Sequence, residues 1–126
     1  MNVLERIDFE CEASNDVNGL FSKDHVKYDC EICYNGKDFS FTYQCNPKYS
    51  QPTKENCIAS LILDAESFEY SRDFEDFCND FGYTKISEYK KAQSIYNACG
   101  KVSSFLSMAF TDEEREELNE LLEDYR

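Results

Sequence analysis

The sequence predicts an α+β fold, in which a three-stranded antiparallel sheet is followed by three to four helices that pack on one face of the sheet. Two patterns support this prediction. Apolar and polar residues alternate in the first part of the chain, and from residue 52 onwards apolar residues recur at helical spacing. With 126 residues, of which 41% are hydrophobic, a single domain is expected over residues 1–126, with a sheet half at 1–46 and a helical half at 52–126.

The first strand is predicted at Val3–Ala13, because its alternate residues divide into an apolar side and a charged side. The apolar side, which also holds Glu5, consists of Val3, Ile7, Phe9, Cys11 and Ala13. The charged side consists of Arg6, Asp8, Glu10 and Glu12. We therefore expect a half-buried strand whose outer side is acidic.

The next two strands are predicted to form a hairpin around Asn35-Gly36, because this dipeptide favours a two-residue turn with positive φ angles. Pairing outward from the turn brings apolar residues of the two strands opposite each other. The expected pairs are Ile32 with Phe39, Cys30 with Phe41, Tyr28 with Tyr43, and Val26 with Cys45. In this register the apolar residues of both strands lie on one face of the sheet.

Two helices are predicted in the following segment. The first begins with Thr53 as its N-cap and is expected to end near Asp64. The second is expected at Arg72–Phe81, with Ser71 as its N-cap and Gly82 as its stop. Its apolar face would consist of Phe74, Phe77, Cys78 and Phe81.

Two further helices complete the predicted fold. The third begins after Ser87 and keeps its helical spacing for about twenty residues, across Gly100. The last begins at Thr111-Asp112-Glu113-Glu114, a capping box whose acidic first turn suits the positive end of the helix dipole. Its buried side is expected to consist of Leu118, Leu121, Leu122 and Tyr125.

The seven cysteines are an odd number, and most occupy apolar positions of periodic segments, which favours reduced thiols in the core. Cys30 and Cys33 have the two-residue spacing of a zinc half-site or a redox pair. In an alternating strand, however, this spacing sends the two thiols to opposite faces. No second pair of ligands follows, so neither a metal nor another cofactor is expected.

The sequence offers little for catalysis. Its one histidine, His25, follows Asp24 at the start of a strand, and sequence alone places no Ser or Cys beside it. The chain lacks a glycine-rich phosphate loop. Asp73, Asp76 and Asp80 have spacings that suit a magnesium or calcium ion, but without the loop of such a site a solvated helix face is favoured. We therefore expect a protein without enzymatic activity.

Charge is the strongest functional signal, because 26 acidic residues against 13 basic ones give a net charge of -13. Carboxylates on the second and the last predicted helices are the predicted partner-binding residues: Asp73, Glu75, Asp76, Asp80, Asp112, Glu113, Glu116, Glu117 and Glu120. Such surfaces repel nucleic acid and attract basic proteins. The expected partner is therefore a basic nucleic-acid-binding protein, and the alternative is that the acidity only keeps the chain soluble and monomeric.

A basic stretch interrupts this acidity. It comprises Lys85, Lys90, Lys91 and Lys101, with Glu88 as the only acid among them. We expect these lysines to form surface ion pairs with neighbouring acidic helices. Contact with a nucleic-acid backbone or with an acidic partner is the alternative.

The helical half contains the motif Phe-x-x-Phe-Cys-x-x-Phe-Gly-Tyr at residues 74–83. It is accompanied by Pro52-Thr53, Ser67-Phe68, Lys91-Ala92 with Ile95-Tyr96, and Phe110-Thr111-Asp112-Glu113-Glu114. Over residues 52–122 the chain thereby resembles a group of small acidic proteins encoded by bacteriophages and related mobile elements, from which it departs by a longer segment between Tyr83 and Ala92. The resemblance implies a phage accessory protein, a class that includes inhibitors of host defence such as anti-CRISPR and anti-restriction proteins.

Two functional hypotheses follow. The leading one is a phage-encoded inhibitor that lays an acidic face on the basic groove of a defence complex, with a CRISPR effector as first choice and a restriction complex as second. The other is an accessory protein that binds replication or transcription machinery through an apolar face. The chain has no long apolar run and no signal-peptide pattern, so we expect it in the cytoplasm of the bacterial host and not in a membrane. The sequence leaves the oligomeric state open.

Overall fold

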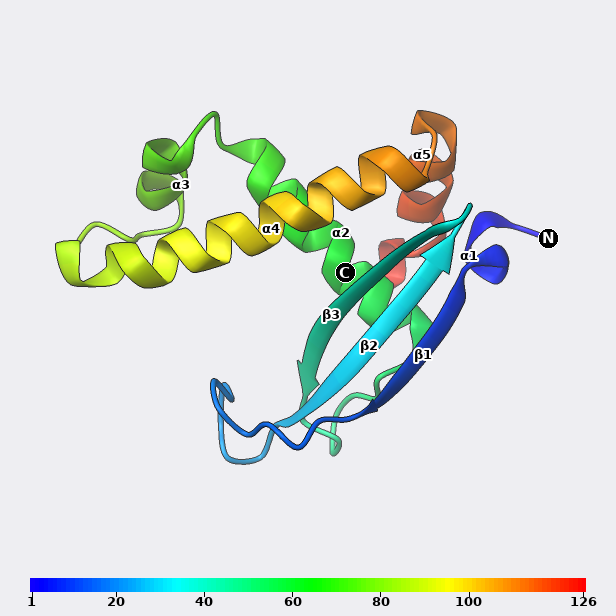
Figure 1. Ribbon diagram of the computed structural model, residues 1–126, viewed down its shortest axis with the longest axis horizontal. Helices are drawn as coiled ribbons and strands as arrows, with labels where there is room; N and C mark the ends of the chain where they lie inside the picture. Colours follow the sequence, from blue (N-terminus) through cyan, green and yellow to red (C-terminus); the bar gives the residue numbers. More distant parts are fainter.

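The computed structural model describes residues 1–126 and shows a three-stranded sheet with helices on one side (Figure 1). The strands are β1 (Asp8–Ala13), β2 (Val26–Tyr34) and β3 (Lys37–Cys45). The helices are α1 (Val3–Arg6), α2 (Lys54–Tyr70), α3 (Phe74–Asp80), α4 (Tyr89–Ala109) and α5 (Asp112–Leu121), with short 3-10 helices η1 (Ile86–Glu88) and η2 (Glu123–Tyr125). The predicted α+β fold is confirmed.

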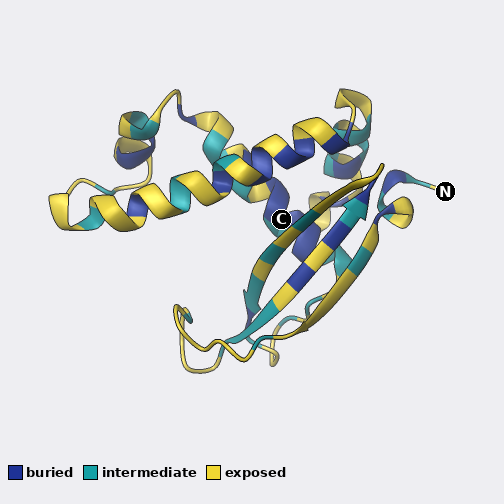
Figure 2. Ribbon diagram, viewed as in Figure 1, coloured by how far each residue is buried: buried dark blue, intermediate teal, exposed yellow.

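The sheet is antiparallel throughout, in the order β1-β2-β3. The predicted hairpin register is confirmed, with Ile32 opposite Phe39 and Cys30 opposite Phe41. Asn35 and Gly36 have φ angles of 53° and 75°, as a two-residue turn of this kind requires. Burial alternates along β2 (Figure 2), because one face of the sheet packs on the helices and the other is open.

The N-terminal segment differs from the prediction, because Val3–Arg6 is helical and the strand begins only at Asp8. Asn2 caps this helix in a capping box with Glu5, and the Val3 N–H donates to the Glu117 carboxylate at 2.6 Å. The predicted apolar side of the strand is only partly covered, because Cys11 and Ala13 lie on an edge strand and are exposed. Long-range docking on α5 thus overrides the local alternation.

The two middle helices also differ from their predicted limits. Helix α2 has the expected N-cap, Thr53, but runs on to Tyr70, well beyond Asp64. Ser71 ends α2, and the N-cap of α3 is Asp73. Helix α2 continues because Ala65 is fully buried in the core and the ring of Phe68 lies against Gly100 of α4. A Cβ atom at position 100 would lie 2.9 Å from that ring, so glycine permits the close approach of α2 and α4.

The last two helices begin as predicted. Helix α4 spans Tyr89–Ala109, and Thr111 caps α5 in the predicted capping box with Glu114. Leu118 and Leu122 are buried as expected, but Leu121 and Tyr125 are 37% and 50% exposed. Tyr125 is exposed because α5 ends at Leu121 and the chain continues as η2, which changes the helical phase of the final residues, whereas Leu121 lies in α5 at the edge of its buried side.

The hydrophobic side chains form a main core and a separate aromatic cluster. The main core joins the inner sheet face to α1, α2, α4 and α5, with residues from Val3 to Leu122. The distal aromatic cluster holds α3 against α2 and α4, and consists of Phe68, Phe74, Phe77, Phe81 and Tyr96. Helix α3 is therefore anchored at the end of the molecule away from the sheet (Figure 1).

Candidate functional site

The acidic residues of α3 mostly serve α3 itself. Asp73 accepts the Asp76 N–H at 2.9 Å as the N-cap, and Asp76 accepts a 2.7 Å hydrogen bond from Arg72. Asp80 accepts a 2.8 Å hydrogen bond from the Ser71 hydroxyl. Of the four predicted binding residues at this helix, only the Glu75 side chain makes no hydrogen bond or ion pair within the chain. Helix α3 is consequently the weaker of the two predicted acidic faces.

Helix α5 separates its carboxylates into two kinds. Glu117 accepts from the Val3 N–H, while Glu114 accepts from the Tyr34 hydroxyl and from the Thr111 N–H at 2.9 Å. These bonds, with the Thr111 N–H first among them, lower the pKa of Glu114. The remaining predicted residues on α5 are exposed and make no hydrogen bond or ion pair: Asp112, Glu113, Glu116 and Glu120. We call these four residues the α5 stripe, because helical spacing puts them on one side of α5.

A third acidic surface lies on the open face of the sheet and was not among the predicted binding residues. We call it the open sheet face. Its carboxylates are exposed and make no ion pair: Asp8, Glu10, Glu12, Asp29, Glu31 and Asp38. The predicted acidic outer side of the first strand and the confirmed hairpin register already indicated this surface, because all six residues occupy outward-facing positions of their strands, but only pairing β1 with β2 brings them together.

The open sheet face sets like charges directly against each other. Glu10 pairs with Glu31, and Glu12 pairs with Asp29, across β1 and β2. Such pairs destabilise a sheet. The face also contains a hollow of about 920 Å³, whose polar lining is Glu10, Glu12, Asp29, Glu31, Ser40 and Thr42. A concave acidic surface of this kind suits a protruding basic group of a partner.

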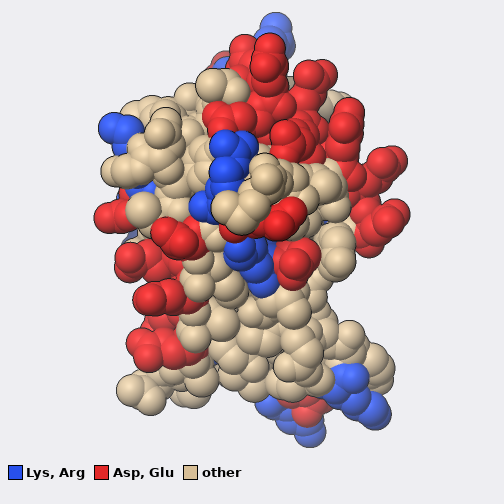
Figure 3. Space-filling view, turned by 90° about the vertical axis from the view of Figure 1, so that its right-hand side faces the viewer, with Lys and Arg blue, Asp and Glu red and all other residues tan.

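Figure 3 shows the charges from the side that carries α1, β1 and α5. Acidic side chains gather at the top and right of this view and form a second group down its left edge. The left edge corresponds to the side of the molecule that faces the viewer in Figure 1, where the open sheet face lies. A column of basic side chains, with a few acidic ones beside it, runs through the middle of the view between these two acidic groups.

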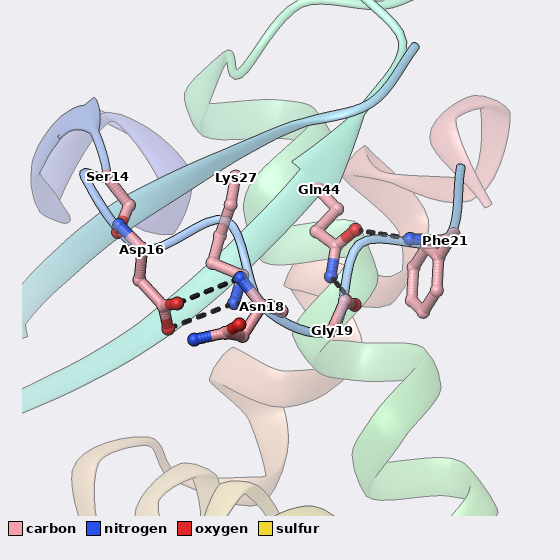
Figure 4. Close-up of polar contacts among 7 residues, drawn as sticks. All are labelled: Ser14, Asp16, Asn18, Gly19, Phe21, Lys27 and Gln44. Carbon is pink, nitrogen blue, oxygen red and sulfur yellow. Dashed lines mark hydrogen bonds and ion pairs between the residues drawn. The ribbon is translucent and has the colours of Figure 1, made fainter. Parts of the chain in front are cut away.

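The loop between β1 and β2 is tied to one end of the open sheet face (Figure 4). Lys27 donates to the Asp16 carboxylate at 3.3 Å and to the Asn18 carbonyl, and its side chain is only 12% exposed. Gln44 donates to the Gly19 carbonyl at 2.8 Å and accepts the Phe21 N–H at 3.0 Å. Lys27 is the only basic residue of the strands at a position that faces the open side of the sheet. Its ammonium group is paired with acceptors of the loop. The six carboxylates therefore have no cation among them.

The basic stretch does not form the expected ion pairs. None of the five ion pairs of the chain involves Lys85, Lys90, Lys91 or Lys101. All four lysines are exposed. The first part of α4 extends beyond the sheet (Figure 1), and Asp73, Asp76 and Asp80 near α3 accept hydrogen bonds from Asp76, Arg72 and Ser71 and not from these lysines. The lysines therefore remain available to a partner.

The cysteines are free thiols, and five of the seven are buried. Cys30 faces the core and Cys33 belongs to the opposite face, as their spacing predicts. The Cys30 and Cys57 sulfurs lie 4.0 Å apart, and their hydrogen bond lowers the pKa of Cys30 and raises that of Cys57. No group of three His, Cys, Asp or Glu side chains is arranged to hold a metal ion.

The His25 ring has one hydrogen-bonding side chain beside it, and the sequence alone did not place that side chain there. Its Nδ1 lies 2.7 Å from the Ser22 hydroxyl, which also accepts the Asp24 N–H at 3.3 Å. This contact is local to the loop, and no side chain of the protein hydrogen-bonds to the other ring nitrogen. His25 also lies outside the hollow of the open sheet face. The arrangement lacks the orienting group that activates a serine–histidine pair.

None of the helices is long and apolar enough to span a membrane. Comparisons of the chain with protein-family models, with curated proteins and with solved structures gave no match.

Proposed function

We propose that this chain is a phage-encoded binding protein that inhibits a bacterial nucleic-acid-targeting defence system. In this proposal its acidic surfaces occupy the basic groove of the effector and keep nucleic acid out. A CRISPR effector is the first candidate partner, and a restriction complex is the second. The chain acts in the host cytoplasm without enzymatic activity. The phage setting rests on the resemblance of the helical half.

The observation that supports this proposal is the set of exposed carboxylates that have no cationic partner within the chain. They occupy the open sheet face and the α5 stripe. Residues 8 to 12 of β1 span about 14 Å at about 3.4 Å per residue, and all six carboxylates of the open sheet face lie within this length. The same length of duplex DNA carries about eight phosphates, at one per about 1.7 Å. The two charge densities are therefore comparable.

The binding experiment uses a purified guide-loaded CRISPR effector, a purified restriction complex and a fluorescent target duplex. Fluorescence anisotropy of the duplex reports its displacement by the chain at low and at moderate salt. One variant neutralises the open sheet face (Glu10→Gln, Glu12→Gln, Asp29→Asn and Glu31→Gln). A second neutralises the α5 stripe (Asp112→Asn, Glu113→Gln, Glu116→Gln and Glu120→Gln). The matched control removes four other acids that make no ion pair: Asp24→Asn, Glu55→Gln, Glu123→Gln and Asp124→Asn.

We expect the chain to displace the duplex from one of the two complexes, and at least one surface variant to weaken displacement by tenfold or more, about 1.4 kcal/mol. The control variant should lose much less, and added salt should weaken displacement by the original chain most strongly. Equal displacement by all variants would rule out the charge-based mechanism. Binding to a polymerase or replication factor that does not respond to these changes would favour the alternative accessory role.

A further inference from the structure

The outer edge of β3 is a second feature that a partner can use. In a two-residue hairpin the residues that flank the turn, here Tyr34 and Lys37, form a hydrogen-bonded pair. Alternate residues of β3 therefore direct their backbone N–H and C=O groups away from β2: Asp38, Ser40, Thr42 and Gln44. No backbone or side-chain group of the chain bonds to these outward groups. The edge is a row of unused donors and acceptors.

The opposite edge of the sheet, at β1, is partly covered. The Lys54 ammonium donates to the Ile7 carbonyl at 2.6 Å and to the Leu4 carbonyl at 3.0 Å. The Cys11 thiol donates to the Pro52 carbonyl at 3.5 Å, which places the segment before α2 alongside β1. Strand β3 has no such cover, so the two edges of the sheet differ in their capacity to bind another strand.

A groove lies beside the free edge, between β3 and α4. Its volume is about 680 Å³, its apolar lining consists of Phe39, Phe68, Phe105 and Met108, and Asp38, Asn97 and Lys101 supply polar groups to the lining. Phe39 stacks on Phe105 with ring centroids 4.9 Å apart, and Met108 is 66% exposed. Gly100 and Ser104 of α4 also line the groove, together with the ring of Phe68, which lies against Gly100. A strand added to β3 would direct every second side chain into this groove.

The other side chains of such a strand would point towards the open sheet face. That side of the sheet carries six carboxylates that form no ion pair, of which Asp38 lies on β3 itself. Basic side chains at these alternate positions would therefore meet charges of opposite sign. A bound strand would therefore place apolar side chains in the groove and basic side chains on the open sheet face, at alternate positions.

We propose that β3 binds an extended segment of its partner as a fourth strand, and that this segment alternates apolar and basic residues. Addition of a strand to a sheet edge is an established way of recognising a peptide. Backbone hydrogen bonds supply affinity, while the β3 groove and the open sheet face select the alternation. This inference rests on the proposed function, since it names the chemistry of the segment by which a basic partner is recognised.

The test uses a synthetic peptide of about ten residues, long enough to follow β3, in which lysine and valine alternate. A second peptide has the same composition in blocks of like residues, so its charge is identical. We expect the alternating peptide to bind at least tenfold more tightly. Its binding should also slow amide hydrogen exchange, measured by NMR on the unmodified chain, at Ser40, Thr42 and Gln44.

The matched variants are Thr42→Pro and Thr42→Val. Proline removes an N–H that faces away from β2, so the hairpin ladder stays intact, whereas valine keeps that N–H. We expect Thr42→Pro to weaken binding of the alternating peptide at least tenfold and Thr42→Val to leave it within about twofold. Thermal unfolding of both variants checks that the fold is retained.

Equal affinity for the two peptides, or unprotected amides along β3 in the unmodified chain, would overturn the fourth-strand inference. That result would not affect the acidic surfaces, because duplex displacement by the neutralised variants is measured separately. Conversely, failure of all displacement experiments combined with edge binding of the alternating peptide would reject the proposed function and retain the strand site.

Discussion

Helices α3 and α5 carry the two acidic faces that the sequence predicts, yet they use their carboxylates differently. On α3, Asp73 and Asp76 are engaged in the cap of the helix and in an ion pair with Arg72. On α5, Glu114 and Glu117 bind α5's own cap, Tyr34 and α1, and the α5 stripe remains free. A carboxylate near a helix N-terminus often caps the helix. It is therefore a candidate for partner binding only when the structure shows that it makes no such structural contact.

The length of the helix accounts for part of this difference. Helix α3 has seven residues, so most of its positions lie in a terminal turn where backbone groups need partners. Helix α5 has ten residues and a capping box that engages only Thr111 and Glu114, which leaves more of its acids uninvolved. Substitution of a partnered carboxylate and of an unpartnered one should therefore change the free energy of unfolding by different amounts, and in some cases in opposite directions.

The largest effect is expected at Asp64, a half-buried carboxylate of α2 that has no partner within the chain. Burial raises the pKa of Asp64 to about 6. A carboxyl whose folded pKa exceeds its unfolded value destabilises the fold when it is ionised, so the penalty is full above pH 6 and disappears near pH 4. Asp64→Asn should therefore raise the free energy of unfolding by about 1–3 kcal/mol at pH 7.5.

Urea unfolding of the original chain and of Asp64→Asn between pH 4 and pH 8 measures this effect. The two stabilities should converge towards pH 4. A stability difference that does not change with pH would show that ionisation of Asp64 is not the cause.

The next largest change in stability is expected at Glu114, and its neighbour Glu113 serves as the comparison. Glu114→Ala removes half of the capping box and the acceptor of the Tyr34 hydroxyl, and should cost about 1–2 kcal/mol at pH 7. Glu113→Ala should change stability by less than about 0.5 kcal/mol, since the Glu113 side chain is exposed and makes no hydrogen bond or ion pair. Because the pKa of Glu114 is lowered in the fold, its contribution is present above its unfolded pKa and is lost as the pH falls through the folded pKa.

Chemical denaturation of both variants at pH 7 and pH 3 tests this pair. The cost of Glu114→Ala should be smaller at pH 3 than at pH 7. Equal costs for the two substitutions would contradict the distinction between structural and free acids on α5.

A smaller effect is expected on α3. Asp73→Ala removes the N-cap and should destabilise α3 by about 1 kcal/mol, whereas Glu75→Ala should have almost no effect. Hydrogen exchange of the α3 amides is the suitable measurement, because the distal aromatic cluster holds α3 apart from the main core. Faster exchange in both variants alike would show that Asp73 has no special capping role.

The sequence predicts the parts of this molecule that depend on neighbouring residues. Asn35-Gly36 determines the hairpin register, and the capping box at Thr111 determines the start of α5. The misassigned parts depend on distant contacts. Glu117 supports α1 from 114 positions away, and Gly100 receives the Phe68 ring so that α2 continues past Asp64. No local pattern contains this information.

In the candidate site, too, local sequence predicts some features and distant contacts decide the others. Alternation along β1 and β2 places each acid on the outward side, but the alternation does not show which acids of β1 meet which acids of β2. Whether a helical acid is free also depends on partners such as Tyr34 and Val3, which lie far from α5 in the sequence. The open sheet face could therefore be suspected from the sequence but not defined as a site.

The smallest predicted effect tests whether the open sheet face is maintained at the expense of stability. Glu31 lies directly opposite Glu10, and a like-charged pair in this position is destabilising by about 0.2–1 kcal/mol. Glu31→Gln should therefore stabilise the fold by that amount while it weakens partner binding, a combination typical of residues retained for function. Thermal unfolding at low and high salt measures the gain in stability, which should shrink as salt screens the repulsion.

The control for this prediction is the same substitution in a Glu10→Gln background, where it should stabilise less because the repulsion is already gone. An equal gain in both backgrounds would mean that Glu10 and Glu31 do not interact, and the open sheet face would then carry its charge without cost.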